Sequence, residues 1–125
     1  MLDSSLQRLL EEAVNTSTKL AIVLLYTEQR RSSATPQQIS QQICRDIWSV
    51  EEALQELVED GILVYEGSQY HYRPVPEWSE SLARLVTTYD DPLRRQEIVR
   101  VVHELDSYAP YRHVLKQRKV VVFSN

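Results

Sequence analysis

Cysteine and glycine are nearly absent from this chain. Of its 125 residues, one is cysteine, Cys44, and two are glycine, Gly61 and Gly67. A single cysteine forms no intramolecular disulfide, so nothing indicates an oxidising compartment. We expect Cys44 to be a small core residue rather than a nucleophile. The two separate glycines also exclude a glycine-rich loop for phosphate binding.

Long hydrophobic runs are missing as well. No apolar stretch approaches the roughly 20 residues that span a bilayer. The first four residues, Met1 to Ser4, lack the basic and apolar regions of a signal peptide. We therefore expect a cytoplasmic protein without membrane contact. Its formal net charge of −4 gives no general attraction to nucleic acid or to anionic membranes.

Residue patterns for catalysis or metal binding are also lacking. The three histidines, His71, His103 and His113, form no i,i+4 pair and no zinc-type spacing with Cys44. Adjacent acidic pairs such as Glu51-Glu52 diverge on a helix, so solvation and helix capping explain them. We expect no enzymatic activity, no catalytic residues, no cofactor and no metal.

Strong local signals instead mark the stretch from Thr35 to Arg73. Thr35-Pro36-Gln37-Gln38 predicts a helix start, with a threonine cap, proline at the first position and a capping box. Ser49-Val50-Glu51-Glu52 predicts a second capping box. The helix that it opens has apolar residues on one face, namely Val50, Ala53, Leu54, Leu57 and Val58.

A β-hairpin is predicted to follow this second helix. Gly61 stands where a helix is closed by a residue in the left-handed conformation. The β-rich runs 62–65 and 69–73 are joined through Glu66-Gly67-Ser68, a composition typical of a tight turn.

These residues resemble a known family. Val50, Leu57, Gly61, Ile62 and Leu63, followed by a hairpin that ends in Tyr-x-Tyr-Arg, resemble the recognition helix and wing of winged-helix proteins such as the MarR-like regulators. The resemblance covers about a third of the chain. It implies a helix-turn-helix whose second helix enters the DNA major groove, while the hairpin, or wing, contacts the neighbouring backbone.

Further helices are predicted on both sides of this motif. Asp3 or Ser4 can cap a first amphipathic helix. The run 20–26 is apolar all round and fits either a strand or a buried helix. We choose a helix because the winged-helix pattern requires one there, and we expect a polar loop over 30–34.

After the hairpin, the stripe from Trp78 to Tyr89 predicts a helix, with Trp78 in the core. Pro92 begins another helix, whose predicted apolar face is Leu93, Ile98, Val101, Val102 and Leu105. Residues 111–118 suggest a short helix. The tail 119–125 resembles a strand, which we expect to dock either on a sheet edge or along a helix.

The predicted architecture is mainly α, of the α+β class. It is a winged helix-turn-helix with a small antiparallel hairpin and extra N- and C-terminal helices. We expect one domain, 1–125, with its core motif at 18–73, a C-terminal helical extension at 76–118 and the tail at 119–125.

Charge on the predicted recognition helix disagrees with DNA binding. From Asp46 to Arg73 there are seven acidic residues and one basic residue, a balance of −6. Cations that neutralise phosphates supply most non-specific DNA affinity, so this surface is a poor match for DNA. A solvated helix face also explains the individual glutamates. The residues of the candidate interaction surface are Trp48, Glu51, Glu52, Gln55, Glu56 and Gln69.

Positive charge gathers towards the C-terminus. From Pro92 to Asn125 there are seven basic and three acidic residues, a balance of +4. If they converge, these residues could bind an anion; otherwise they form the basic end of a dipolar molecule. The candidate anion-binding residues are Arg94, Arg95, Arg112, Lys116, Arg118 and Lys119.

Two functional interpretations follow. In the first, the chain is a non-enzymatic interaction module whose altered winged-helix surface binds an unknown protein partner. Trp48 is then an exposed anchor of the kind enriched at interfaces, although from sequence alone we favour a core position for it. In the second, the chain is a dimeric MarR-like transcription regulator that binds DNA through bases outside the recognition helix. In either case we expect a homodimer.

Overall fold

A computed structural model describes residues 2–29 and 31–107 of the chain. The helix predicted for 111–118, the tail 119–125 and the basic residues Arg112, Lys116, Arg118 and Lys119 lie outside the described residues.

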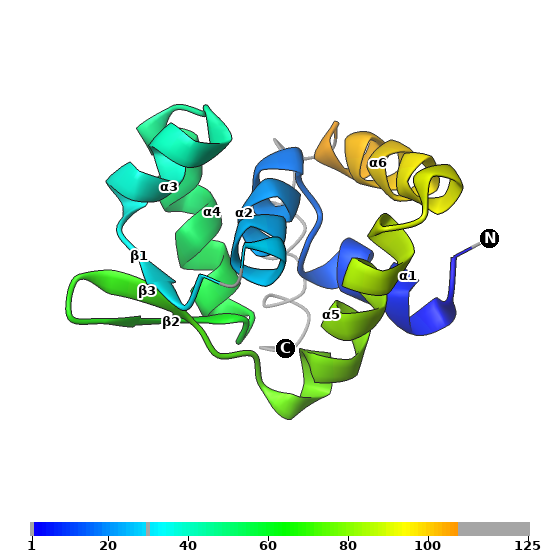
Figure 1. Ribbon diagram of the computed structural model, residues 1–125, viewed down its shortest axis with the longest axis horizontal. Helices are drawn as coiled ribbons and strands as arrows, with labels where there is room; N and C mark the ends of the chain where they lie inside the picture. The colour runs from blue at the N-terminus through cyan, green and yellow to red at the C-terminus, as the bar shows by residue number, and fades with distance from the viewer. Residues whose placement is uncertain (1, 30, 108–125) are drawn as a thin grey trace, which may run out of the picture.

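The described part of the chain is mainly helical and carries a small antiparallel sheet, which confirms the α+β prediction. In Figure 1, α2 lies between two groups of elements. On one side are α3, α4 and the sheet, and on the other are α1, α5 and α6. The elements are α1 (Ser4–Glu12), α2 (Ser17–Glu28), β1 (Ser33–Ala34), α3 (Pro36–Ile43), α4 (Ile47–Glu59), β2 (Leu63–Glu66), β3 (Gln69–Tyr72), α5 (Pro76–Tyr89) and α6 (Pro92–Asp106).

Local capping signals set most helix starts where the sequence predicts them. Asp3 caps α1, and Thr16 caps α2 by accepting a hydrogen bond from the Lys19 amide. Thr35 and Gln38 form the reciprocal capping box at the start of α3, and Asp91 caps α6 in front of Pro92. The ambiguous run 20–26 is helical, as chosen.

The predicted start of α4 is wrong. The helix begins at Ile47, not at a Ser49 capping box, because the Asp46 carboxylate accepts hydrogen bonds from the Ser49 amide at 2.9 Å and from the Ser49 hydroxyl at 2.8 Å. These bonds hold the pKa of Asp46 below its ordinary value. The helix therefore contains one turn more than predicted, and that turn includes Trp48.

The sheet has the strand order β1-β3-β2, with both pairs antiparallel. The hairpin turn consists of Gly67 and Ser68, which lie within the predicted turn, and both residues have positive φ, 62° and 63°. Two positive φ angles suit the right-handed twist of the strands that the turn joins. The loop expected at 30–34 is wrong in part, since Ser33 and Ala34 pair with His71 and Tyr70 of β3. Two residues are too few for a periodic signal in the sequence.

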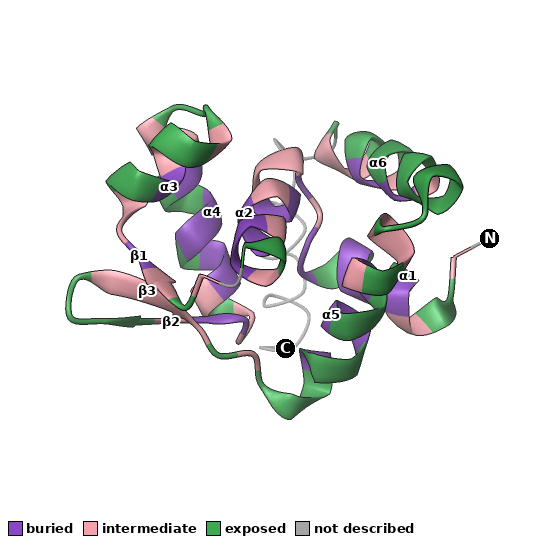
Figure 2. Cartoon of the chain, in the orientation of Figure 1, coloured by how far each residue is buried: buried purple, intermediate pink, exposed green. Residues whose placement is uncertain are grey.

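The core surrounds α2, whose buried residues contact both groups of helices (Figure 2). The Tyr26 hydroxyl donates a 2.6 Å hydrogen bond to the Tyr70 carbonyl and ties α2 to the sheet. Burial raises the pKa of Tyr26 to about 12. Trp78 is buried as predicted, but two other predictions are wrong: Leu93 is 81% exposed in the first turn of α6, and Cys44 is exposed with φ +57° where α3 ends.

The end of α4 is joined tightly to the start of α5. Gly61 (φ +83°) closes α4 as predicted, with hydrogen bonds from Gly61 N to Val58 O and from Ile62 N to Leu57 O. The Val75 amide then donates to the Gly61 carbonyl at 2.8 Å, and the Trp78 indole donates to the Asp60 carbonyl at 2.8 Å.

Alanine substitutions at the two glycines separate backbone strain from a steric clash. A Cβ at Gly61 would lie 3.1 Å from Val75 Cγ2, whereas one at Gly67 would meet nothing within 4 Å. Gly67→Ala is expected to cost about 1 kcal/mol of unfolding free energy, and Gly61→Ala about 2–3 kcal/mol, measured by urea denaturation. Adding Val75→Ala to Gly61→Ala should recover part of the difference. Equal costs at both glycines would contradict a role for Val75.

Candidate interaction surface

The exposed side of α4 carries a single stripe of five residues, which we call the α4 stripe. Its members follow one another at intervals of three, one, three and four and lie opposite the buried side chains of Val50, Ala53, Leu54 and Leu57. The stripe is negatively charged and contains no lysine or arginine. It consists of Trp48, Glu51, Glu52, Gln55 and Glu59.

Trp48 is the most exposed aromatic residue that the structure describes. Its relative accessibility is 78%, so the prediction that Trp48 lies in the core is wrong. The early start of α4 explains this exposure, because it places Trp48 on the side of the helix opposite the buried residues Val50 and Leu54. An exposed tryptophan in a regular helix requires a reason other than packing.

The hairpin lies next to the α4 stripe. Tyr65, 56% exposed, packs against Tyr70 with ring centroids 4.8 Å apart. Burial raises the pKa of Tyr70, and the Tyr65 phenol and the Glu51 carboxylate raise it further. Gln69 is half-buried near the turn. The predicted interaction-surface residues that are exposed are Trp48, Glu51, Glu52 and Gln55.

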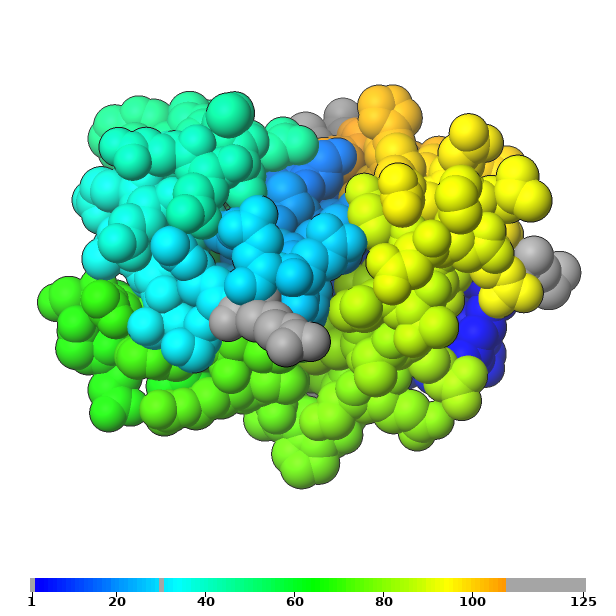
Figure 3. Space-filling view, viewed as in Figure 1, coloured from blue at the N-terminus to red at the C-terminus, as the bar shows by residue number. Residues whose placement is uncertain are grey.

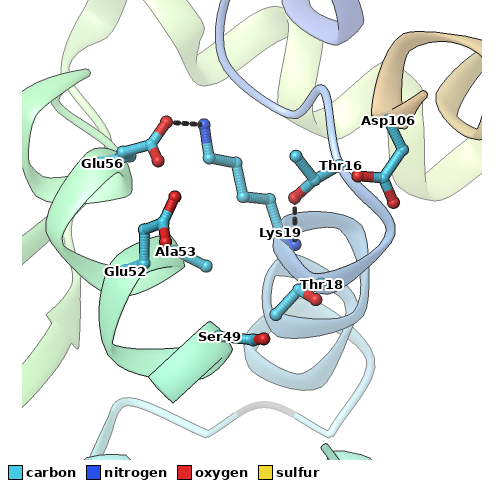
Figure 4. A pocket seen from close by; sticks show the side chains of 8 residues that line it. All are labelled: Thr16, Thr18, Lys19, Ser49, Glu52, Ala53, Glu56 and Asp106. Atoms are coloured by element: carbon cyan, nitrogen blue, oxygen red, sulfur yellow. Dashed lines mark hydrogen bonds and ion pairs between the residues drawn. The ribbon is translucent and has the colours of Figure 1, made fainter. Parts of the chain in front are cut away.

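Glu56 does not belong to this surface, and its assignment there is corrected. Only 8% of its side chain is exposed, and its Oε1 lies 2.8 Å from Nζ of Lys19, whose side chain is 2% exposed. The Lys19 ammonium also donates to Asn15 Oδ1 at 3.0 Å. This buried ion pair joins α2 to α4 (Figure 4).

A polar pocket of about 160 Å³ borders this ion pair. Asp106 of α6 lies at its rim and accepts a 3.0 Å hydrogen bond from the Ser17 amide, at the start of α2. In Figure 4 the Glu56 and Glu52 side chains come from α4, and Lys19 points towards Glu56 from α2. The pocket is lined by Thr16, Thr18, Lys19, Ser49, Glu52, Ala53, Glu56 and Asp106.

Sequence reasoning missed Lys19, although a signal for it exists. In helical spacing Lys19 shares a face with Ile22, Val23 and Tyr26, all of which are buried. A lysine on a fully apolar face requires a buried acidic partner. The identity of that partner, 37 residues further along the chain, has no local signature.

The predicted basic residues on α6 do not converge on one site. The Arg95 guanidinium stacks 4.9 Å from the Tyr89 ring centroid, and its Nε donates to the Tyr89 carbonyl at 2.8 Å. Arg94 instead lines a separate hollow that includes Asp3 and Glu80. The remaining predicted anion-binding residues lie outside the described ranges.

Comparison with models of known families, with curated proteins and with solved structures found no match to this chain. Across residues 2–29 and 31–107, no histidine, cysteine and carboxylate side chains are grouped as a metal site would require. Within the same ranges, no helix has the length and apolar character needed to cross a membrane.

The buried ion pair gives a stability prediction. Glu56→Leu and Lys19→Met should each destabilise the fold by about 3–5 kcal/mol, because each leaves one uncompensated buried charge. The double variant removes both charges, so it should be more stable than either single variant by urea denaturation.

An exposed ion pair supplies the control. The Arg84 and Glu80 side chains are 51% and 76% exposed, and Glu80→Ala should leave the unfolding midpoint unchanged. Additive losses in the double variant would contradict direct coupling between Lys19 and Glu56.

Proposed function

We propose that this chain is a non-enzymatic winged-helix protein, related to transcription regulators, whose recognition helix binds a protein partner rather than DNA. The order of elements supports the winged-helix assignment: helix α2, short strand β1, helices α3 and α4, and the β2–β3 hairpin follow one another as that motif requires. In this assignment α4 is the recognition helix and the β2–β3 hairpin is the wing.

The observation that carries the proposal is the composition of the α4 stripe. A recognition helix approaches phosphates, where cations supply most of the non-specific affinity. Here the outward side presents three glutamates, Glu51, Glu52 and Glu59, which phosphates would repel. Trp48 at the end of the stripe is instead typical of the anchors that dominate protein interfaces.

One observation favours the alternative, a dimeric MarR-like DNA-binding regulator. Arg94, Arg95 and Arg100 are exposed on α6, so cations are available outside the recognition helix. Helix α6 lies on the other side of α2 from α3, as the two ends of the space-filling view show (Figure 3), and α4 lies on the α3 side of α2 in Figure 1. A regulator of this kind would need α6 to contact phosphates while α4 avoids them.

Binding to random duplex DNA distinguishes the two functions. We expect a dissociation constant no tighter than about 10⁻⁴ M at physiological salt, measured by fluorescence anisotropy of a labelled duplex. The reason is repulsion between the glutamates of α4 and the phosphates. Micromolar binding that weakens steeply with salt would overturn the proposal and favour the regulator.

A gain of DNA binding tests the role of α4 directly. The triple variant Glu51→Lys, Glu52→Lys and Gln55→Lys should bind the duplex at least about tenfold tighter than the wild type, because three cations then face the groove. The matched control Gln7→Lys, Glu28→Lys and Glu104→Lys changes the net charge equally at exposed sites elsewhere. Equal affinities for the two triple variants would show that α4 is not placed as a recognition helix.

A further inference from the structure

The outer side of α6 carries a second surface, opposite in charge to the α4 stripe. A shallow groove of about 430 Å³ runs along it and begins at the first residue of α2. Val99, 46% exposed, supplies apolar surface, and two arginines supply positive charge. We call it the α6 groove; the described residues that line it carry no carboxylate. They are Ser17, Arg95, Gln96, Val99, Arg100 and His103.

The α6 groove and the α4 stripe flank the same turn of the chain. Ser17 lines the groove, and its amide is bound by Asp106. Asp106 in turn lines the polar pocket together with Thr16 and Glu52, and Glu52 belongs to the α4 stripe. The start of α2 therefore lies between α4 and the end of α6, as Figure 4 shows for Thr16 between Glu52 and Asp106.

The two surfaces complement each other in chemistry. The stripe contains an exposed indole and three carboxylates, while the groove is lined by the exposed Val99 and by two arginines, of which Arg95 also stacks on the Tyr89 ring. An indole in the groove would cover Val99 and stack with an arginine, a contact that is strongest with tryptophan. The carboxylates one turn away from the indole would then lie beside the cationic rim.

We propose that the α6 groove binds the Trp48 end of α4 from a second copy of this chain. This rests on the proposed function, since it names the first protein partner of the α4 stripe. Because the two surfaces flank one turn, a two-fold dimer forms the contact twice: each copy gives its tryptophan to the other's groove. The contact covers the exposed Trp48 and Val99 and brings the acidic α4 stripe of one copy against the arginines of the other copy's α6 groove.

Removing the indole tests the contact. The full-length protein should be a dimer at tens of micromolar in light scattering and sedimentation velocity. Trp48→Ala should weaken dimerisation at least about tenfold, as expected for a central anchor. Leu93→Ala is the matched control, because Leu93 is equally exposed on α6 but does not line the groove; its dimer should equal the wild type.

Charge reversal tests which surfaces meet. Arg100→Glu and Glu51→Lys should each give a monomer, because each places like charges across both contacts. An equimolar mixture of these two variants should form a heterodimer, since every contact in it again joins opposite charges. Arg94→Glu and Glu28→Lys, exposed positions outside both surfaces, are the controls and should remain dimeric alone.

The possible results decide between the two ideas. A wild-type monomer at these concentrations, or a dimer that is indifferent to Trp48→Ala and Arg100→Glu, overturns the self-association proposal. If DNA binding is also absent, the proposed function stands and its partner is another protein. Alternatively, the variants change dimerisation as expected while the wild type binds random DNA at micromolar concentration. That result supports the contact between copies and contradicts the proposed function.

Discussion

The ion pair between Lys19 and Glu56 determines how α4 lies against α2. Each charge would cost several kcal/mol to bury alone, so the two must meet wherever both helices are packed. This requirement fixes the rotation of α4 about its own axis. With Glu56 at the edge of the buried side of α4, helical geometry places Glu52, one turn earlier, beside the polar pocket, and Trp48, two turns earlier, on the exposed side. The buried pair thus selects which side chains a partner of α4 can contact.

The surface that results combines a large apolar group with charge of one sign. Such a surface gives specificity in two ways, because an apolar anchor requires a matching groove and the carboxylates reject anionic partners. The same sequence places cations on α6, at the other side of the start of α2. The α4 stripe and the α6 groove are therefore opposite in charge, although α6 as a whole carries three arginines and three acidic residues.

Local signals in the sequence predicted most of the helices and the hairpin. The Thr35 capping box, Gly61 and the proline at the start of α6 act within a few residues, so their meaning can be taken from the sequence alone. The predicted start of α4 was wrong because two residues within one turn, Asp46 and Ser49, can each cap a helix. The boundary of such a helix therefore cannot be assigned from the sequence to within one turn.

Long-range features of the site could not be predicted in this way. The pairing of Ser33 and Ala34 with β3 depends on where the hairpin lies, and the burial of Glu56 depends on a lysine in another helix. Helical periodicity predicted that Leu93 belongs to the apolar face of α6. It lies in the first turn of that helix, where no neighbouring element covers it. Trp48, Glu51, Glu52 and Gln55 were correctly recognised as surface residues, whereas Glu56 was assigned to the same surface and is buried.

The short connection between the hairpin and α5 limits how the chain can be divided. The Val75 amide and the Trp78 indole donate hydrogen bonds to the carbonyls of Gly61 and Asp60. Residues that follow the hairpin therefore satisfy the carbonyls at the end of α4. A fragment that stops at Arg73 would lose these donors and expose the apolar end of α4 to water. We therefore expect that the segment from α3 to the β2–β3 hairpin does not fold without α5.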